Sequence, residues 1–401
     1  MSDNVIIVGA GASVDAGVPV LRNFVDTMWE IAIRGRIGDK VLEDSDKEIF
    51  KRAMAVRDDL NEYHGRAAFD DRNIEDILSL LTFNQMAGGR GTRTDIPSIT
   101  KAIARTIELT CKVRHSGSLN SVQQEGSDIY RRFWRGFVRH VDSLKRQLPA
   151  IISFNYDLVF ERSFLQSFVG MDYSPFDESK PFPFDRVSID YHYDQLDDHQ
   201  YSRKFVSFRG ASMVPKQGVR LVREIPASDR RALSIPILKL HGSVNFPQPA
   251  SRKRESSASK AIDPDFTDLP RALDDPYILP PIFNKTSSGP TVMWKEALNQ
   301  LREAKNVTIV GYSLPRTDIY MQYFLKSALG PNLNLNKITV FNPLLYNEGR
   351  QEMEDRYASC FAPQLRNRIV FKPHHERYEG QPGTFEHFVD LLESDPAKLF
   401  F

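Results

Sequence analysis

Polar side chains that could take part in catalysis follow two short, mostly apolar runs of this sequence. Asn155 and Asp157 come directly after Ile151–Phe154, and His241 comes directly after Ile237–Leu240. An imidazole can exchange protons near neutral pH, so His241 is the best candidate for a general base. Asn155 could hold a ligand hydroxyl or an attacking water through its amide. The alternatives are a core histidine with satisfied hydrogen bonds, and helix capping by Asn155 or Asp157.

A glycine-bearing turn near the N-terminus could bind phosphate groups. It follows Val5–Val8, an apolar run that predicts a buried parallel strand. Small side chains let a backbone approach a pyrophosphate closely. The usual Gly-x-Gly-x-x-Gly spacing is not completed, however, because Val14 stands where the third glycine would be. A serine here could cap a helix or help to bind phosphate, and a nearby arginine could pair with phosphate or lie on the surface. The candidate residues are Gly9, Ala10, Gly11, Ser13 and Arg22.

A framework is needed to bring these distant segments together, and the apolar pattern predicts one. Apolar runs predict buried strands at 5–8, 150–154, 237–240, 307–310 and 338–341. Helical periodicity occurs at 20–37, 158–168, 293–304, 318–329 and 384–392. Such alternation predicts an α/β fold, a Rossmann-like parallel sheet covered by helices. Ligands of such sheets bind outside the carboxyl ends of the strands, where Asn155 and His241 are expected.

The rest of the pattern predicts one domain, residues 1–401, with insertions. Residues 38–147 lack strand-like runs but show helical periodicity, which predicts a largely helical insertion after the first βα unit. Residues 171–234 are rich in Pro, Asp and Tyr, and the segment 247–278 contains the polar, serine-rich stretch 252–264. Both segments are therefore expected to be loop-rich insertions.

Charge and cysteine content exclude several protein classes. The formal charge is +1, from 53 basic and 52 acidic residues, so no global field for nucleic acid or a membrane is expected. Arginines at 131, 132, 135 and 139 share one predicted helix and could be a solvated face or a nucleic-acid site. Two cysteines exclude a disulfide framework. With no apolar run of about 18 residues and no room for a signal peptide before the first strand, a cytoplasmic protein is expected.

Five segments match, in order, elements of one known family. They are Gly-Ala-Gly-Ala-Ser followed by Gly-Val-Pro-Val-Leu-Arg at 9–22, Phe-Asn-Tyr-Asp at 154–157, Leu-His-Gly-Ser at 240–243, Gly-Tyr-Ser at 311–313 and Val-Phe-Asn at 340–342. Together they resemble the sirtuin (Sir2) family of NAD-consuming proteins. The resemblance implies that NAD is the substrate and that Asn155 and His241 are catalytic. It further implies that NAD is bound by the glycine turn and by Asp157, Gly311, Ser313 and Asn342.

The chain departs from the protein-deacylating sirtuins in three respects. Those enzymes carry a four-cysteine zinc module after the histidine, whereas this chain has only Cys111 and Cys360. Two cysteines cannot form a four-thiolate zinc site, so no zinc is expected. Val20 and Leu21 replace the usual acidic and aromatic residues of the first loop, and the asparagine and histidine motifs lie 86 positions apart (241 − 155). These differences predict a remodelled region where an acyl-lysine peptide would enter.

With these departures the chain looks more like Sir2-like effectors of bacterial anti-phage defence, which resemble NAD hydrolases that deplete the cell of NAD. Its Ile-Glu-Asp-Ile-Leu stretch at 74–78 adds to this likeness. A chain that is nearly all Sir2-like domain further resembles the subunit that assembles with a HerA-type ATPase. A homo-oligomeric NAD⁺ glycohydrolase without zinc is therefore expected. The alternatives are an NAD-dependent ADP-ribosyl or deacyl transferase, and a non-catalytic nucleotide-sensing subunit.

Overall fold

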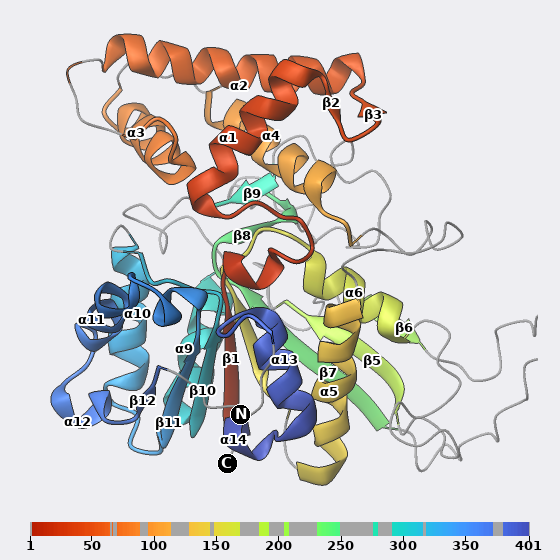
Figure 1. The fold of residues 1–401 in the computed structure, drawn as a ribbon, viewed down its shortest axis with the longest axis vertical. Coiled ribbons are helices and arrows are strands. Elements are labelled where there is room, and N and C mark those ends of the chain that lie inside the picture. The colour runs from red at the N-terminus through yellow and green to blue at the C-terminus, as the bar shows by residue number, and fades with distance from the viewer. Residues whose placement is uncertain are drawn as a thin grey trace, which may run out of the picture.

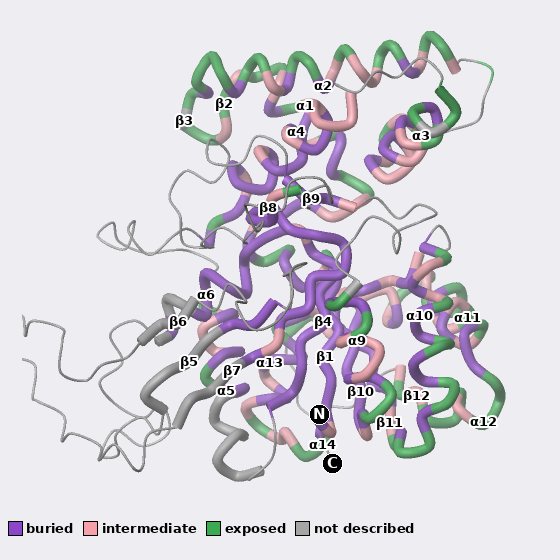
Figure 2. The backbone as a smooth tube through the Cα atoms, turned by 180° about the vertical axis from the view of Figure 1, so that it is seen from behind, coloured by how far each residue is buried: buried purple, intermediate pink, exposed green. Residues whose placement is uncertain are grey.

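The computed structural model describes most of the chain, and Figures 1 and 2 show its course from opposite sides. The described residues are 2–64, 66, 70–88, 95–113, 128–144, 148–168, 184–191, 204–207, 231–248, 276–279, 291–315, 318–371 and 380–400. In Figure 2 the buried residues concentrate in the central strands and on the inner sides of the helices.

The large sheet has eight described strands in the order β12-β11-β10-β1-β4-β7-β5-β6. In chain order these are β1 (Asn4–Val8), β4 (Ala150–Ser153), β5 (Phe184–Asp190), β6 (Lys204–Ser207), β7 (Arg231–Lys239), β10 (Asn306–Val310), β11 (Lys337–Phe341) and β12 (Ile369–Val370). Neighbouring strands pair in parallel, except that the edge strand β6 is antiparallel to β5. The predicted fold class, a Rossmann-like parallel sheet covered by helices, is confirmed.

The central strands are apolar runs that are buried on both faces. All five residues of β1 are buried, and so are all five of β10. Ile7 of β1 pairs with Ile309 of β10 on one side and with Ile152 of β4 on the other. β-branched side chains suit this doubly covered position, which is why local sequence predicts the centre of the sheet.

Helices flank the sheet and also form a separate layer above it (Figure 1). The described helices are α1 (Leu21–Arg34), α2 (Asp44–Tyr63), α3 (Ile74–Met86), α4 (Asp95–Thr110), α5 (Asp128–Leu144), α6 (Val159–Phe168), α9 (Thr291–Glu303), α10 (Ile319–Leu329), α11 (Arg350–Ala358), α12 (Pro363–Arg366), α13 (Phe385–Ser394) and α14 (Ala397–Phe400). The described part of the chain also holds the short 3₁₀ helices η1 (Ala10–Ser13) and η4 (Pro343–Tyr346). None of these described helices is long and apolar enough to cross a membrane.

Helices α5, α6 and α13 pack together through aromatic rings. The Phe133 ring of α5 lies 5.4 Å from that of Phe160 in α6 and 5.6 Å from that of Phe385 in α13. Arg132, one of the arginines that could have formed a nucleic-acid site, instead forms ion pairs with Asp390 and Glu393 of α13. This arginine therefore ties two helices together.

The layer above the sheet, which we call the cap, consists of α1 to α4. In Figure 1 it lies beyond the ends toward which the central strands point. The hairpin of β2 (Arg36–Ile37) and β3 (Lys40–Val41) follows α1, and the pair β8 (Gly242–Pro247) and β9 (Pro276–Ile278) lies between the cap and the sheet. The carboxyl ends of β1, β4, β7 and β10 therefore face the cap.

Parts of the predicted insertions are described, and they form helices and strands. The described part of 38–147 holds β3 and helices α2 to α5, but α5 packs beside the sheet and not in the cap. Within 171–234 the described residues supply β5, β6 and the start of β7 to the main sheet, and within 247–278 they supply β9. The remaining parts of these two segments lie outside the described residues. The division into one domain with insertions stays a prediction.

Candidate active site

Two turns at the carboxyl edge of the sheet, one after β1 and one after β10, are in direct contact. The Gly9 N–H donates to the Val310 carbonyl at 3.0 Å. The Gly11 N–H donates to the Gly311 carbonyl at 2.9 Å. A Cβ atom added to Gly9 would lie 2.7 Å from the Gly311 carbonyl oxygen, and one added to Gly311 would overlap the Ala12 nitrogen. Gly311 also has a φ of +66°, which favours glycine. These glycines are therefore required for the contact between the two turns, and their binding of phosphate stays a prediction.

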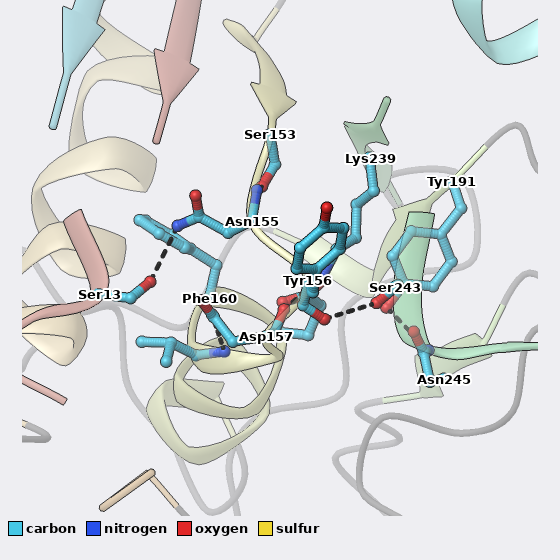
Figure 3. Close-up of polar contacts among 12 residues, drawn as sticks. Ser13, Ser153, Asn155, Tyr156, Asp157, Phe160, Tyr191, Lys239, Ser243 and Asn245 are labelled. Carbon is cyan, nitrogen blue, oxygen red and sulfur yellow. Dashed lines mark hydrogen bonds and ion pairs between the residues drawn. The ribbon is translucent and has the colours of Figure 1, made fainter. Parts of the chain in front are cut away.

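The side chain of Asn155 lies against the first of these turns and is held in one orientation (Figure 3). Its Nδ2 donates to the Gly9 carbonyl at 3.0 Å and to Oγ of Ser13 at 2.9 Å. A main-chain carbonyl can only accept, so the amide nitrogen, and not Oδ1, must face Gly9. Oδ1 is buried and has no hydrogen-bond partner among the described groups. A buried acceptor without a donor is unfavourable, so this oxygen is suited to a ligand hydroxyl or a water.

The other residues predicted around the glycine turn lie in different surroundings. Ser13 is fully buried and accepts from Asn155, whereas Ala10 is exposed. Arg22 is exposed in the first turn of α1. The structure therefore groups Ser13 with Asn155, while contacts from Ala10 and Arg22 to a phosphate stay predictions.

His241 lies in the sharp turn that joins β7 to β8. Gly242 has a φ of +85°, and a Cβ atom added to it would overlap the Tyr277 carbonyl of β9. The turn is therefore pressed against β9. His241 is only 4 % exposed, and the centroid of its ring lies 5.0 Å from that of the Phe154 ring, directly after β4. The sheet thus brings the two predicted catalytic residues to adjacent strand ends, since β4 pairs with β7.

Asp318 is a carboxylate at this edge that was not predicted as a site residue. Its Oδ2 lies 3.5 Å from Nε2 of His241 and accepts from the Tyr312 hydroxyl at 2.8 Å. Its Oδ1 accepts from the Met321 N–H at 3.3 Å and so caps α10. The available signal was an aspartate at the first position of the helix predicted over 318–329, after a strand–turn segment. Helix capping explains that pattern fully, which is why the sequence did not reveal the second contact.

Two tyrosines near His241 are kept protonated by their surroundings. Tyr156 donates its hydroxyl to the Leu279 carbonyl at 3.0 Å. Burial raises the pKa of Tyr156 well above its ordinary value, and the negative charges of Glu75 and Asp318 add to the shift. Burial also raises the pKa of Tyr312, again with Asp318 adding to the shift. Because Glu75 lies in the first turn of α3, a carboxylate of the cap lies within electrostatic reach of this site.

The remaining predicted residues make local contacts in the structure. Asp157 accepts from the Val159 N–H at 3.0 Å and so fills a capping position before α6. Asn342 accepts from the Leu344 N–H at 3.0 Å and caps η4. Ser313 is half-buried in the turn after β10. All three lie at the predicted edge of the sheet, and their contacts with NAD stay predictions.

Neither cysteines nor carboxylates of the described segments gather into a metal site. Cys111 and Cys360 are both free and buried. Burial raises the pKa of the Cys111 thiol to about 12. Within the described ranges, no group of three or more His, Cys, Asp or Glu side chains could hold a metal ion.

Comparison with known proteins finds similarity only among solved structures. No protein-family model and no curated protein matches this chain. A crystal structure of a Sir2 homolog in complex with NAD shares 12 % identity, with 89 % of this chain and 88 % of that chain covered and a TM-score of 0.32. A structure on sirtuin substrate affinity shares 13 % identity, with 89 % and 93 % covered and a TM-score of 0.30. A mutant Sir2 homologue in complex with ADP-ribose shares 10 %, with 89 % and 91 % covered and a TM-score of 0.29. Values this low assign no activity to this chain, whose function must be inferred from its own residues.

Proposed function

We propose that this protein is an NAD⁺ glycohydrolase, which converts NAD⁺ and water to nicotinamide, ADP-ribose and a proton. The observation that carries the proposal is the amide of Asn155. Both of its N–H bonds are used within the protein, while its buried Oδ1 has no partner among the described groups. An acceptor fixed in this way beside a glycine turn, at the carboxyl edge of a parallel sheet, suits a ribose hydroxyl or the attacking water.

The chemistry required is cleavage of the bond between nicotinamide and ribose. Nicotinamide leaves as a neutral molecule while positive charge develops on the sugar, and water then forms a bond to the same carbon. On this proposal His241 accepts a proton from a ribose hydroxyl or from that water. Its burial at 4 % exposure excludes bulk water from the imidazole, which strengthens electrostatic interactions at the reacting centre. Asn155 would orient the group that His241 deprotonates.

Two alternative functions, ADP-ribosyl transfer and nucleotide sensing, predict different products from NAD. Transfer of ADP-ribose to a protein or nucleic acid shares the same first step, so it would release nicotinamide but leave ADP-ribose bound to an acceptor. A nucleotide-sensing subunit would bind NAD without turnover. A buried imidazole paired with a carboxylate is typical of catalytic sites, which favours turnover over sensing.

The motif forms at 154–157 and 240–243 support a more specific proposal about biological role. On this proposal the protein is a cytoplasmic Sir2-like effector that depletes NAD during phage infection. It works as a homo-oligomer, with a HerA-type ATPase as its partner, and it uses no zinc. Light scattering and elemental analysis of the purified protein test the oligomer and the metal, respectively.

The deciding experiment follows nicotinamide and ADP-ribose release from NAD by the purified chain, alone and with a HerA-type ATPase. His241→Ala should lower turnover by about 10²–10⁴-fold, the usual contribution of a general base. Asn155→Ala should lower kcat more than NAD affinity, because its amide acts on the reacting groups. His64→Ala is the matched control: this histidine lies in the cap, where its Nε2 contacts Nδ2 of Asn84 at 2.9 Å.

Three results would count against the proposal. Near-normal turnover by His241→Ala would remove the assigned base. Nicotinamide release without free ADP-ribose would favour transfer. Binding of NAD with no nicotinamide release under either condition would favour the sensing subunit.

A further inference from the structure

The carboxylate of Asp318 is held in place by hydrogen bonds from residues near it in the chain. One oxygen accepts from the Met321 N–H of α10, and the other accepts from the Tyr312 hydroxyl at 2.8 Å. The Asp318 side chain is 1 % exposed. Both oxygens thus act as hydrogen-bond acceptors, as suits a carboxylate.

The segment that carries Tyr312 is also tightly held. The buried Tyr357 hydroxyl donates to the Tyr312 main-chain carbonyl at 2.7 Å. Leu314, fully buried, has a φ of +47°, and it is the one non-glycine residue with positive φ among the described residues. Such a conformation persists only where the surroundings enforce it, and it is enriched at functional sites. Residues 312–314 are therefore held in one conformation by the fold.

Several groups surround the imidazole that Asp318 approaches. Tyr156 and Tyr312 are protonated phenols, and the charge of Glu75 in the cap reaches both of them. Lys239 lies two residues before His241 in the chain, but its Nζ donates to Oε1 of Glu161 at 2.9 Å. Oδ2 of Asp318 lies within ion-pair distance of the ring, at 3.5 Å from Nε2.

A carboxylate in this place has two chemical consequences for a histidine base. Since it can only accept, it favours the tautomer with hydrogen on Nε2, which makes Nδ1 the proton-accepting nitrogen. It also stabilises the imidazolium that forms when that proton is taken up. Pairs of this kind are often long in a ligand-free protein and shorten in the reacting complex.

We propose that Asp318 is the positioning residue of His241: it selects the ring tautomer and stabilises the imidazolium, in addition to capping α10. The kinetic part of this inference rests on the proposed NAD⁺ glycohydrolase activity. The pairing of Asp318 with His241 does not rest on that activity, because it is a property of the protein without NAD.

The test uses Asp318→Asn, which keeps an oxygen able to cap α10 but removes the charge. Proton NMR titration of the histidines, with the His241 signals assigned by their loss in His241→Asn, reports the pKa of His241 without NAD. It should be about 1–3 units lower in Asp318→Asn than in the wild type. Tyr312→Phe is the matched control, because it removes a hydrogen bond from the same carboxylate oxygen but keeps the charge. It should not lower the pKa of His241.

With NAD, Asp318→Asn should lower kcat by up to about tenfold for each unit of lost pKa, with KM little changed. The acid limb of its pH–rate profile should move to lower pH. An unchanged pKa of His241 in folded Asp318→Asn would overturn the pairing. A lowered pKa with unchanged kcat would overturn the positioning role and leave the proposed function standing. If the wild type releases no nicotinamide, the proposed function fails, while the titration still decides the pairing.

Discussion

Replacing Asn155 by aspartate exchanges one atom, the amide nitrogen, for an oxygen of nearly the same size. In the structure that nitrogen donates to the Gly9 carbonyl at 3.0 Å and to Oγ of Ser13 at 2.9 Å. The Ser13 hydroxyl can turn and donate to a carboxylate, but the Gly9 carbonyl cannot. Asn155→Asp therefore places two acceptor oxygens against each other at a residue that is 5 % exposed.

The size of the effect follows from these contacts. Loss of a hydrogen bond removes about 0.5–1.5 kcal/mol, and an unsatisfied buried acceptor costs about 1–3 kcal/mol. Together they predict that Asn155→Asp lowers the free energy of unfolding by about 2–4 kcal/mol at neutral pH. A protonated carboxyl could donate to Gly9, so the introduced group should have a pKa above the ordinary value of about 3.9. A pKa raised in the folded state means that stability is present at low pH and is lost as the pH rises through that value.

Urea unfolding of Asn155→Asp and the wild type, at about pH 4.5 and about pH 7.5, measures both effects. The stability difference should be larger at the higher pH. Asn347→Asp is the matched control: Asn347 is exposed, and its Oδ1 accepts from the Gly349 N–H at 3.0 Å, a role that aspartate fills equally well. If Asn155→Asp and Asn347→Asp are equally stable at neutral pH, the amide orientation inferred for Asn155 is refuted.

Three further predictions concern the turns, the buried thiol and the metal. Gly38 has a φ of +53° with no atom within 4 Å of an added Cβ, so Gly38→Ala should cost about 1 kcal/mol in urea unfolding from left-handed strain alone. Gly311→Ala has similar strain but also overlaps the Ala12 nitrogen, which should add at least about 2 kcal/mol; equal losses would contradict the contact between the turns. Since burial raises the pKa of Cys111 to about 12, a thiol reagent should label it at neutral pH only after unfolding, and rapid labelling of the native protein would contradict its burial. Elemental analysis should find no stoichiometric zinc, and chelators should leave nicotinamide release intact; one tightly held zinc per chain would contradict this.

The centre of the fold was determined by local sequence. Apolar runs at 5–8, 307–310 and 338–341 became β1, β10 and β11 within a residue of their predicted bounds. Short runs with few polar atoms on either face are typical of the middle of a covered parallel sheet, so their position was predicted without knowledge of distant partners. The residue types at the strand ends likewise identified Asn155 and His241 as candidates, and the parallel topology brought them to one edge.

Only the tertiary structure decided how these residues are arranged at that edge. Local pattern placed Asp318 at the start of a predicted helix, where the structure shows it capping α10, but its approach to His241 depends on where β7 and α10 lie in space. The glycines suggested a phosphate turn, and the fold shows that they also allow the turns after β1 and β10 to touch. The orientation of the Asn155 amide could not be predicted from the sequence either, because it depends on the carbonyl of Gly9, 146 residues away. Periodicity and capping act over a few neighbouring residues, whereas a site is built from groups that only packing brings together.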